Sequence, residues 1–262
     1  MPGWNSIRFF TVLVYVFMFA PVMVVVLLSF NASQFGSFPM EGLSLRWFVE
    51  LANNDAIVRA FRTSLLLGSL TAILATTFGI LASLAIVRYD FPGKELINTA
   101  LVAPILVPEV VLGVALLLFM RWLTVPKSFA LLLLGHVIIT LPFVVLVVQA
   151  RLVGIRRVYE EAALSLGANR FQAFMQITFP LLMPAIFAGM LFSFTISFDD
   201  ITATLFWKTA GTETVPTQIF AMLRHSISPE LNALGTVMIV VTVALPLIAG
   251  ALARRFARGA ED

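Results

Sequence analysis

The chain has 262 residues, of which 60% are hydrophobic and only 12% are charged, and its formal net charge is +3. Soluble domains carry about 25% charged residues, so this composition excludes a soluble globular protein. The small positive charge fits basic loops beside a membrane better than a nucleic-acid partner. Cysteine is absent, which excludes disulfides and thiolate metal sites.

The apolar runs predict helices, because they do not alternate with polar residues as the strands of a transmembrane β-barrel do. Six of them are long enough to cross a bilayer, which takes roughly 20 helical residues. The predicted spans are about 9–30, 63–87, 97–123, 129–153, 181–206 and 231–253. We therefore predict an all-α polytopic membrane protein, with six transmembrane helices in a single domain over residues 1–262. Prolines within spans, such as Pro104 and Pro108, indicate bent helices around a path.

An even number of spans places both termini on the same side of the membrane. With cytoplasmic termini, the inner segments hold ten of the seventeen Lys and Arg residues, and such residues favour the cytoplasmic side. The chain is therefore predicted to be multi-pass, with both termini in the cytoplasm. Its first span is too long for the apolar core of a signal peptide, so we expect an uncleaved span there.

Two outer segments differ from simple linkers. The first, residues 31–62, crowds Leu43, Leu45, Trp47 and Phe48 into a short amphipathic stretch. An interfacial helix in the headgroup region explains this pattern, and so does a partly ordered loop that caps the bundle. The second, residues 207–230, is rich in Thr, Gly and Pro and is long enough to contact an external partner.

Motifs for catalysis are missing from the sequence. It contains no G-x-x-x-x-G-K-[ST], no H-E-x-x-H and no C-x-x-C. The two histidines, His136 and His225, lie far apart in sequence, and we expect His136 to form hydrogen bonds between helices rather than to bind a metal. The chain is thus predicted to be no enzyme, with no metal and no cofactor of its own.

Three acidic residues lie inside predicted spans: Glu109, Asp199 and Asp200. A charge at the centre of a membrane helix costs about 2.5–3.5 kcal/mol on insertion scales, so a polar path for a cationic solute is one reason for their presence. Buried hydrogen bonds between bent helices are the other. Because helical neighbours point about 100° apart, Asp199 and Asp200 are expected to face different surroundings.

The segment between the fourth and fifth spans, residues 160–180, has its own pattern. Residues 160–166 favour a helix, Gly167 interrupts it, residues 171–177 form a second amphipathic run, and Pro180 opens the next span. This pattern predicts two short helices joined by a glycine turn on the membrane surface, a shape well suited to contact with a partner protein.

The spacing within this segment is specific. It consists, in order, of Glu161-Ala162-Ala163, three residues, Gly167, nine residues, Ile177, one residue and Phe179-Pro180. This series resembles the E-A-A-x3-G-x9-I-x-L-P loop of permease subunits of binding-protein-dependent ABC importers, with Phe179 where that family usually has Leu.

Other stretches resemble the spermidine/putrescine branch of these permeases, and together they cover nearly the whole chain. They are residues 29–33, 43–48, 108–111, 193–195 with 199–200, and 228–230 with 232–234. Residues 207–216 depart from that branch, which tends to have a shorter Gly-Pro turn there.

The resemblance implies a type I importer permease, whose segment 160–180 is the coupling helix gripped by a separate cytoplasmic ATPase. The implied coupling residues are Glu161, Ala162, Ala163, Gly167, Phe171, Phe174, Met175, Ile177 and Pro180. Gly167 would be the turn, and Phe171, Phe174 and Met175 the apolar anchor.

The implied partners are a second, homologous permease in a heterodimer, two ATPase subunits that hold ATP and Mg, and an external solute-binding protein, in a bacterial inner membrane. The implied solute is small and cationic or amine-containing, such as spermidine or putrescine, with Glu109, Asp199 and Asp200 on its path. An ion-coupled secondary transporter that uses Glu109 or Asp199 is the alternative, although the inverted repeats common in such transporters are not evident here.

Overall fold

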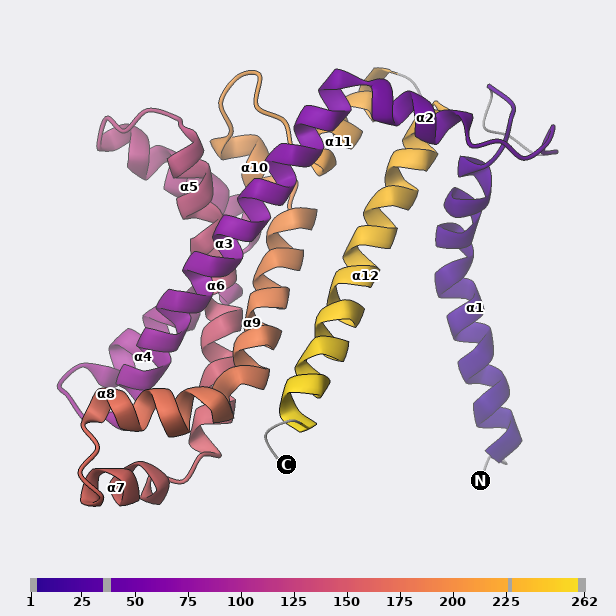
Figure 1. Ribbon diagram of the computed structural model, residues 1–262. Coiled ribbons are helices and arrows are strands. Elements are labelled where there is room, and N and C mark those ends of the chain that lie inside the picture. Colours follow the sequence, from indigo (N-terminus) through magenta and orange to yellow (C-terminus); the bar gives the residue numbers. More distant parts are fainter. Residues whose placement is uncertain (1–3, 35–38, 226–227, 259–262) are drawn as a thin grey trace. The chain divides into compact units, whose positions relative to one another are not determined.

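The computed structural model describes residues 4–34, 39–225 and 228–258, and Figure 1 shows them as an assembly of helices. Regular secondary structure in these residues is helical, apart from one isolated antiparallel bridge between Asn31 and Leu43. Five helices are long and apolar enough to cross a membrane, or six when a bent pair is counted as one span. The prediction of an all-α polytopic fold is confirmed.

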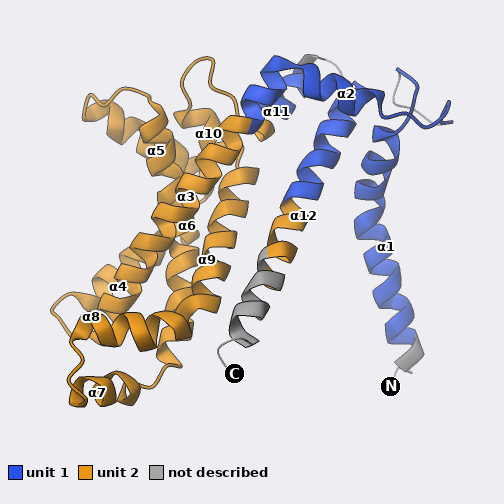
Figure 2. Ribbon diagram, viewed as in Figure 1, with its two compact units in different colours: residues 1–61, 218–241 blue, residues 62–217, 242–262 orange. Residues whose placement is uncertain are grey.

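Contacts divide the chain into two compact units, coloured separately in Figure 2. The first comprises residues 1–61 with 218–241, and the second comprises residues 62–217 with 242–262. Helices α3 (Asp55–Arg88), α11 (Val215–His225) and α12 (Pro229–Arg258) contribute residues to both units.

The first unit contains α1 (Trp4–Ser29) and α2 (Arg46–Asn53). No residue in the most apolar window of α1 is buried, as expected of a span that faces lipid or another subunit. In α2 the Trp47 side chain is buried, and its Nε1 donates to the Asn31 carbonyl at 2.7 Å. The amphipathic stretch predicted there does form a helix, anchored to the end of α1 by this hydrogen bond.

The second unit holds most of α3 and the helices of the central chain. They are α4 (Lys94–Val102), the 3-10 helix η1 (Ala103–Leu106), α5 (Glu109–Trp122), α6 (Phe129–Val153), α7 (Val158–Ser165), α8 (Arg170–Ala173), the π-helix η2 (Phe174–Thr178), α9 (Phe179–Asp199) and α10 (Thr202–Trp207). Within this unit α7 and α8 lie at one end, and α5 and α10 lie at the other (Figure 1).

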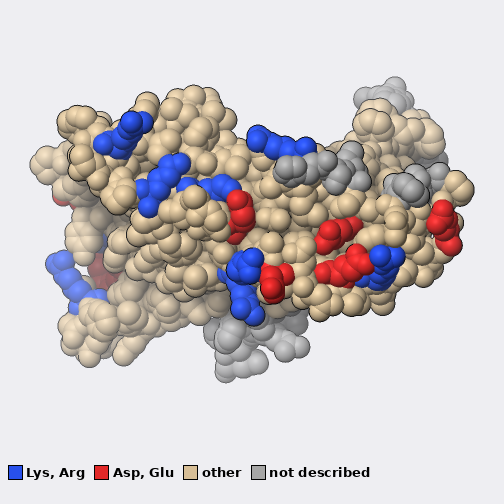
Figure 3. Space-filling view, turned by 90° about the horizontal axis from the view of Figure 1, so that it is seen from above, with Lys and Arg blue, Asp and Glu red and all other residues tan. Residues whose placement is uncertain are grey.

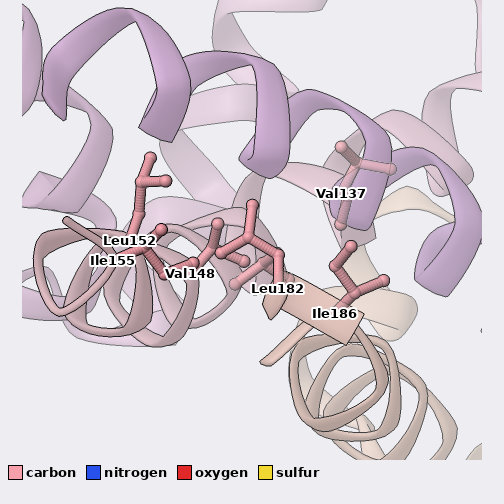
Figure 4. Close-up of a cluster of buried hydrophobic side chains, with 8 residues drawn as sticks. Val137, Val148, Leu152, Ile155, Leu182 and Ile186 are labelled. Atoms are coloured by element: carbon pink, nitrogen blue, oxygen red, sulfur yellow. The ribbon is translucent and has the colours of Figure 1, made fainter. Parts of the chain in front are cut away.

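Small residues let three helices of this unit approach closely. A Cβ atom added to Gly79 of α3 would meet Val144 Cγ1 at 2.5 Å, and one added to Gly189 of α9 would meet the same atom at 3.2 Å. Val144 of α6 therefore occupies the space that two missing side chains leave, which is the usual way in which membrane helices pack. It belongs to a buried apolar cluster that Figure 4 shows in close-up, made of Ala75, Val137, Val144, Val148, Leu152, Ile155, Leu182 and Ile186.

Charged side chains are sparse on the surface. Seen from above, most of the atoms in Figure 3 belong to uncharged residues, with scattered positive and negative groups between them. The face seen there is therefore largely uncharged, in keeping with the low charged fraction of the sequence.

Two predicted spans are interrupted in the structure. The third is a pair of helices, Lys94–Leu106 and Glu109–Trp122, inclined by 114° to each other. Val107 is extended at the break, and Pro108 follows with no N–H to donate. The fifth was predicted to continue to residue 206, but α9 ends at Asp199 and the chain restarts as α10 after an extended Asp200.

Candidate functional site

Helix α7 ends in a glycine turn at the centre of the predicted coupling segment. Gly167 has φ +93°, a left-handed conformation that side chains with a Cβ rarely adopt. The Gly167 N–H donates to the Leu164 carbonyl at 3.0 Å, and the Ala168 N–H donates to the Ala163 carbonyl at 3.1 Å. This pair of bonds is a Schellman motif, so the glycine stops the helix and satisfies its last carbonyl groups.

A capping box starts the next helix directly after the turn. The Asn169 side chain accepts from the Gln172 N–H at 2.9 Å, and the Gln172 side chain accepts from the Asn169 N–H at 2.9 Å. Helix α8 runs without a break into the π-helical turn η2 and then into α9. Pro180 lies in the first turn of α9, and its missing N–H explains why the backbone hydrogen bonding departs from the α pattern just before it.

The predicted anchor residues divide between two environments. The Phe171 side chain is 68% exposed and Met175 is 42% exposed. Phe174, in contrast, is half-buried and packs against the cluster in Figure 4 and against the Phe179 ring. Leu166, at the tip of the turn, is 90% exposed and was not among the predicted coupling residues. Its position directly before the helix-ending Gly167 is the sequence feature that could have indicated it.

The remaining coupling residues lie along the same surface. Glu161 and Ala162 are exposed, while Ala163 and Ile177 are half-buried. The Glu161 carboxylate lies 3.8 Å from Arg157 on the solvent-facing side of α7. This end of the second unit therefore presents apolar side chains beside both acidic and basic ones, with Arg156, Arg157 and Arg170 also exposed.

Glu160, which the sequence analysis did not select, is the residue that ties α7 to the rest of the unit. Its Oε1 accepts from Arg88 Nε at 3.1 Å and from Thr178 Oγ1 at 2.7 Å. Arg88 also donates to the Ile155 carbonyl at 3.1 Å. The side chains of Arg88, Glu160 and Thr178 line a cavity of about 260 Å³, together with Arg157, Glu161, Arg170 and neighbouring apolar residues.

At the opposite end of the unit, two of the three predicted path residues come together. Glu109 is exposed in the first turn of α5, and its carboxyl group lies within hydrogen-bonding reach of Asp200. The Asp200 side chain is buried, and its oxygens accept from the N–H groups of Ala203 and Thr204 at 3.2 and 2.8 Å. Asp200 thus caps α10, with the Glu109 carboxyl group beside it.

Asp199 points elsewhere. It is exposed, and its Oδ1 accepts from Thr242 Oγ1 of α12 at 3.1 Å. The two neighbouring aspartates face different surroundings, as predicted, but the cause is the end of α9 at Asp199 and the extended backbone of Asp200 rather than the angle between helical neighbours.

His136 of α6 joins the buried side of this site. Its ring nitrogens lie 2.8 Å from Ser197 Oγ and 3.0 Å from Thr204 Oγ1, and its Nε2 lies 3.5 Å from Asp200. The predicted role in bonding between helices fits this geometry, because the ring links α6 to α9 and α10. Among the described residues, no group of three or more His, Cys, Asp or Glu side chains is arranged to hold a metal ion.

Comparisons with known proteins agree with this architecture. The chain is 34% identical over 250 residues to the spermidine/putrescine transport system permease protein PotC of Escherichia coli K12, which covers 95% of this chain and 94% of that protein. It is 34% identical over 232 residues to the putrescine transport system permease protein PotI of the same organism, covering 86% and 82%.

Among solved structures, a chain in the crystal structure of a bacterial alginate ABC transporter, in complex with an alginate pentasaccharide-bound periplasmic protein, matches with a TM-score of 0.74. At 17% identity over 97% of this chain and 98% of that one, this likeness concerns the fold alone. Residues 75–261 match the family described as binding-protein-dependent transport system inner membrane component. The resemblance stated from the sequence is confirmed, and the chain belongs to the family of binding-protein-dependent transport system inner membrane components.

Proposed function

We propose that this chain is the permease subunit of an ATP-driven importer that moves a small cationic or amine-containing solute, such as spermidine or putrescine, across the bacterial inner membrane. The identity to two polyamine permeases over most of the chain is the observation that carries this proposal. Both relatives are named as polyamine permeases, and the identity extends through both interrupted spans.

The acidic site supports the choice of a cationic solute. Glu109 is exposed at the break between η1 and α5, and Asp200 lies next to it. A carboxyl group in a membrane helix is costly unless it faces a polar path or a partner, and an amine passing the break would meet Glu109 first. Asp200, being buried and fully engaged with α10, supports Glu109 rather than the solute. Asp199 provides a second exposed carboxylate on α9, beside Thr242 of α12.

The segment at the other end of the unit is proposed to be the coupling helix. Leu166, Phe171 and Met175 are exposed apolar residues that an ATPase cleft would cover, and Glu161 and Ala162 lie beside them. The full assembly would contain a second, homologous permease, two ATPase subunits that hold ATP and Mg, and an external solute-binding protein. Both termini of this chain would be cytoplasmic.

Reconstitution tests the proposal. The chain is co-expressed with the transport subunits encoded beside its gene, and the complex is reconstituted into liposomes with its binding protein. We expect uptake of labelled putrescine or spermidine that requires ATP and is insensitive to ionophores, while labelled sulfate is not imported. Ionophore-sensitive uptake without ATP would support the secondary transporter instead. Uptake of sulfate alone would contradict the cationic solute.

A further inference from the structure

The two adjacent glutamates of α7 border the same cavity but differ in exposure and in partners. Glu161 faces solvent, with an exposed side chain 3.8 Å from Arg157. Glu160 faces the protein, and only 22% of its side chain is exposed. The family motif begins at Glu161, so the position before it is not part of the pattern that identified this segment.

Glu160 receives hydrogen bonds from two other elements. Arg88 is the last residue of α3, and its Nε lies 3.1 Å from Glu160 Oε1. Thr178 is the last residue of η2, its side chain is buried, and its hydroxyl lies 2.7 Å from the same oxygen. A half-buried carboxylate that accepts from a guanidinium forms a charge-assisted interaction, stronger than a neutral hydrogen bond.

Arg88 extends the contact to a fourth place in the chain. Its NH2 group donates to the Ile155 carbonyl, between α6 and α7, at 3.1 Å, and its own side chain is only 11% exposed. The polar contacts of Arg88, Glu160 and Thr178, which we call the Glu160 node, thus link α3, the α6–α7 connection, α7 and the start of α9.

The π-helical turn contributes to the geometry of this node. An extra residue per turn rotates the positions before it relative to α9, and η2 ends at Thr178 directly before α9 begins. Single π-helical turns are frequent at functional sites. Here the π-helical turn ends at Thr178, whose hydroxyl donates to Glu160 of α7.

We propose that the Glu160 node is the internal link that transmits displacement of α7 to α3 and α9, so that Glu160 and Arg88 are positioning residues for coupled transport. This inference rests on the proposed function of residues 160–180 as the coupling helix. Glu161, on the outer side of α7, is left for the partner. A rigid polar link suits this role because apolar contacts alone let helices slide, whereas a directional charge-assisted bond fixes their register.

The test measures solute imported per ATP hydrolysed in the reconstituted complex. Glu160→Gln keeps the shape of the side chain and an acceptor oxygen but removes the charge. We expect it to assemble normally and retain ATP hydrolysis, while solute imported per ATP falls about tenfold. Thr178→Val removes one donor and is expected to lower the ratio about threefold. In the double variant the effects should not multiply, because both changes act on one contact.

A matched control lies near the same end of α3. Asp90 is exposed and pairs with Lys94 of α4 at 2.9 Å, and Asp90→Asn removes a carboxylate whose hydrogen bond is to that lysine rather than to α7 or α9. Its ratio should equal that of the wild type. A wild-type ratio in Glu160→Gln, or parallel loss of assembly, hydrolysis and uptake, would overturn the node as a transmission element.

A second measurement is independent of transport. The native chain has no cysteine, so spin labels can be placed at Leu166→Cys and Leu81→Cys, both exposed positions. The distance distribution between them should be narrow in the otherwise wild-type chain and broad in Glu160→Gln. A distance distribution that stays narrow in Glu160→Gln contradicts the node, even if transport fails in that variant. Absence of ATP-dependent uptake by the wild type contradicts the proposed function alone.

Discussion

At the scale of single residues, two adjacent acidic pairs within the described part of the chain share the same division of roles. Glu160 and Asp200 are tied inside the protein by hydrogen bonds, while their neighbours Glu161 and Asp199 are exposed. In α7 the difference follows from the angle of about 100° between helical neighbours, whereas α9 ends at Asp199 and Asp200 is extended. The exposed member of each pair has a partner at the surface, because Glu161 lies near Arg157 and Asp199 accepts from Thr242.

The acidic site yields a prediction that separates binding from stability. Glu109→Gln removes an exposed charge, so we expect the KM for putrescine to rise about tenfold, a change of about 1.4 kcal/mol, with unfolding unchanged. Asp200→Asn weakens the cap of α10 and is expected to lower the free energy of unfolding by about 1–3 kcal/mol. Uptake kinetics and thermal unfolding in detergent measure the two effects.

Glu95→Gln is the control for this pair, because Glu95 is an exposed carboxylate on α4. It should leave both the KM and the unfolding temperature unchanged. An unaltered KM in Glu109→Gln would show that the path for a cationic solute does not pass this carboxyl group.

Gly167 gives the second prediction at this scale. A β-branched residue cannot adopt φ +93° without strain of about 1–2 kcal/mol, whereas Asn is tolerated in left-handed turns. Gly167→Val should therefore insert into the membrane but lose coupled uptake, and Gly167→Asn should retain most of it. Membrane fractionation and uptake per ATP check this pair, and equal activity of the two variants would contradict a conformational role for the glycine.

At the scale of elements, local sequence signals account for some boundaries and fail at others. The fourth span was predicted at 129–153, and α6 has those bounds because Ser128 accepts from the Leu131 N–H at 3.2 Å and Gly154 follows the last turn. The prolines of the third span indicated a bend, but its angle of 114° depends on packing that no local pattern encodes. The end of α9 depends on Asp200, which accepts from the nearby Thr204 N–H and also lies 3.5 Å from His136 of α6, an element distant in sequence.

The same limit applies to the functional residues. The E-A-A spacing predicts the coupling segment, because its residues are close together in sequence. Glu160 was not recognised, since its role depends on Arg88, 72 positions away. Phe174 was assigned to the anchor because it is aromatic and lies between Phe171 and Met175. The structure shows that it is half-buried, because it packs against the buried apolar cluster, and no local pattern predicts that contact.

Packing between α6 and α10 supports the third prediction. A Cβ atom added to Gly135 would lie 2.0 Å from the Trp207 ring, and that ring is fully buried with its Nε1 bonded to the Gly113 carbonyl at 2.8 Å. Gly135→Ala must displace the ring and should cost about 1–3 kcal/mol of stability. Gly235→Ala, where the nearest atom is 3.6 Å away, should be neutral or slightly stabilising. Thermal unfolding compares them, and equal midpoints would contradict the tight packing.

At the scale of the whole molecule, one helix connects the two candidate sites of the second unit. Helix α9 has 21 residues, or about 30 Å at 1.5 Å per residue. It begins beside the Glu160 node and ends at Asp199, next to Asp200. With residues 160–180 as the proposed coupling helix, a shift of the first turn of α9 would reach the acidic site along one continuous helix, which contains Pro184.

Coupling through α9 requires the two ends of the second unit to lie on opposite sides of the membrane, and labelling tests that requirement. Leu166→Cys and Ala210→Cys place single thiols at exposed positions of a chain that has none. With residues 160–180 in the cytoplasm, a membrane-impermeant maleimide added to spheroplasts should label Ala210→Cys, and Leu166→Cys only after permeabilisation. Labelling of Leu166→Cys in intact spheroplasts would reverse the orientation, and no cytoplasmic ATPase could then contact this segment.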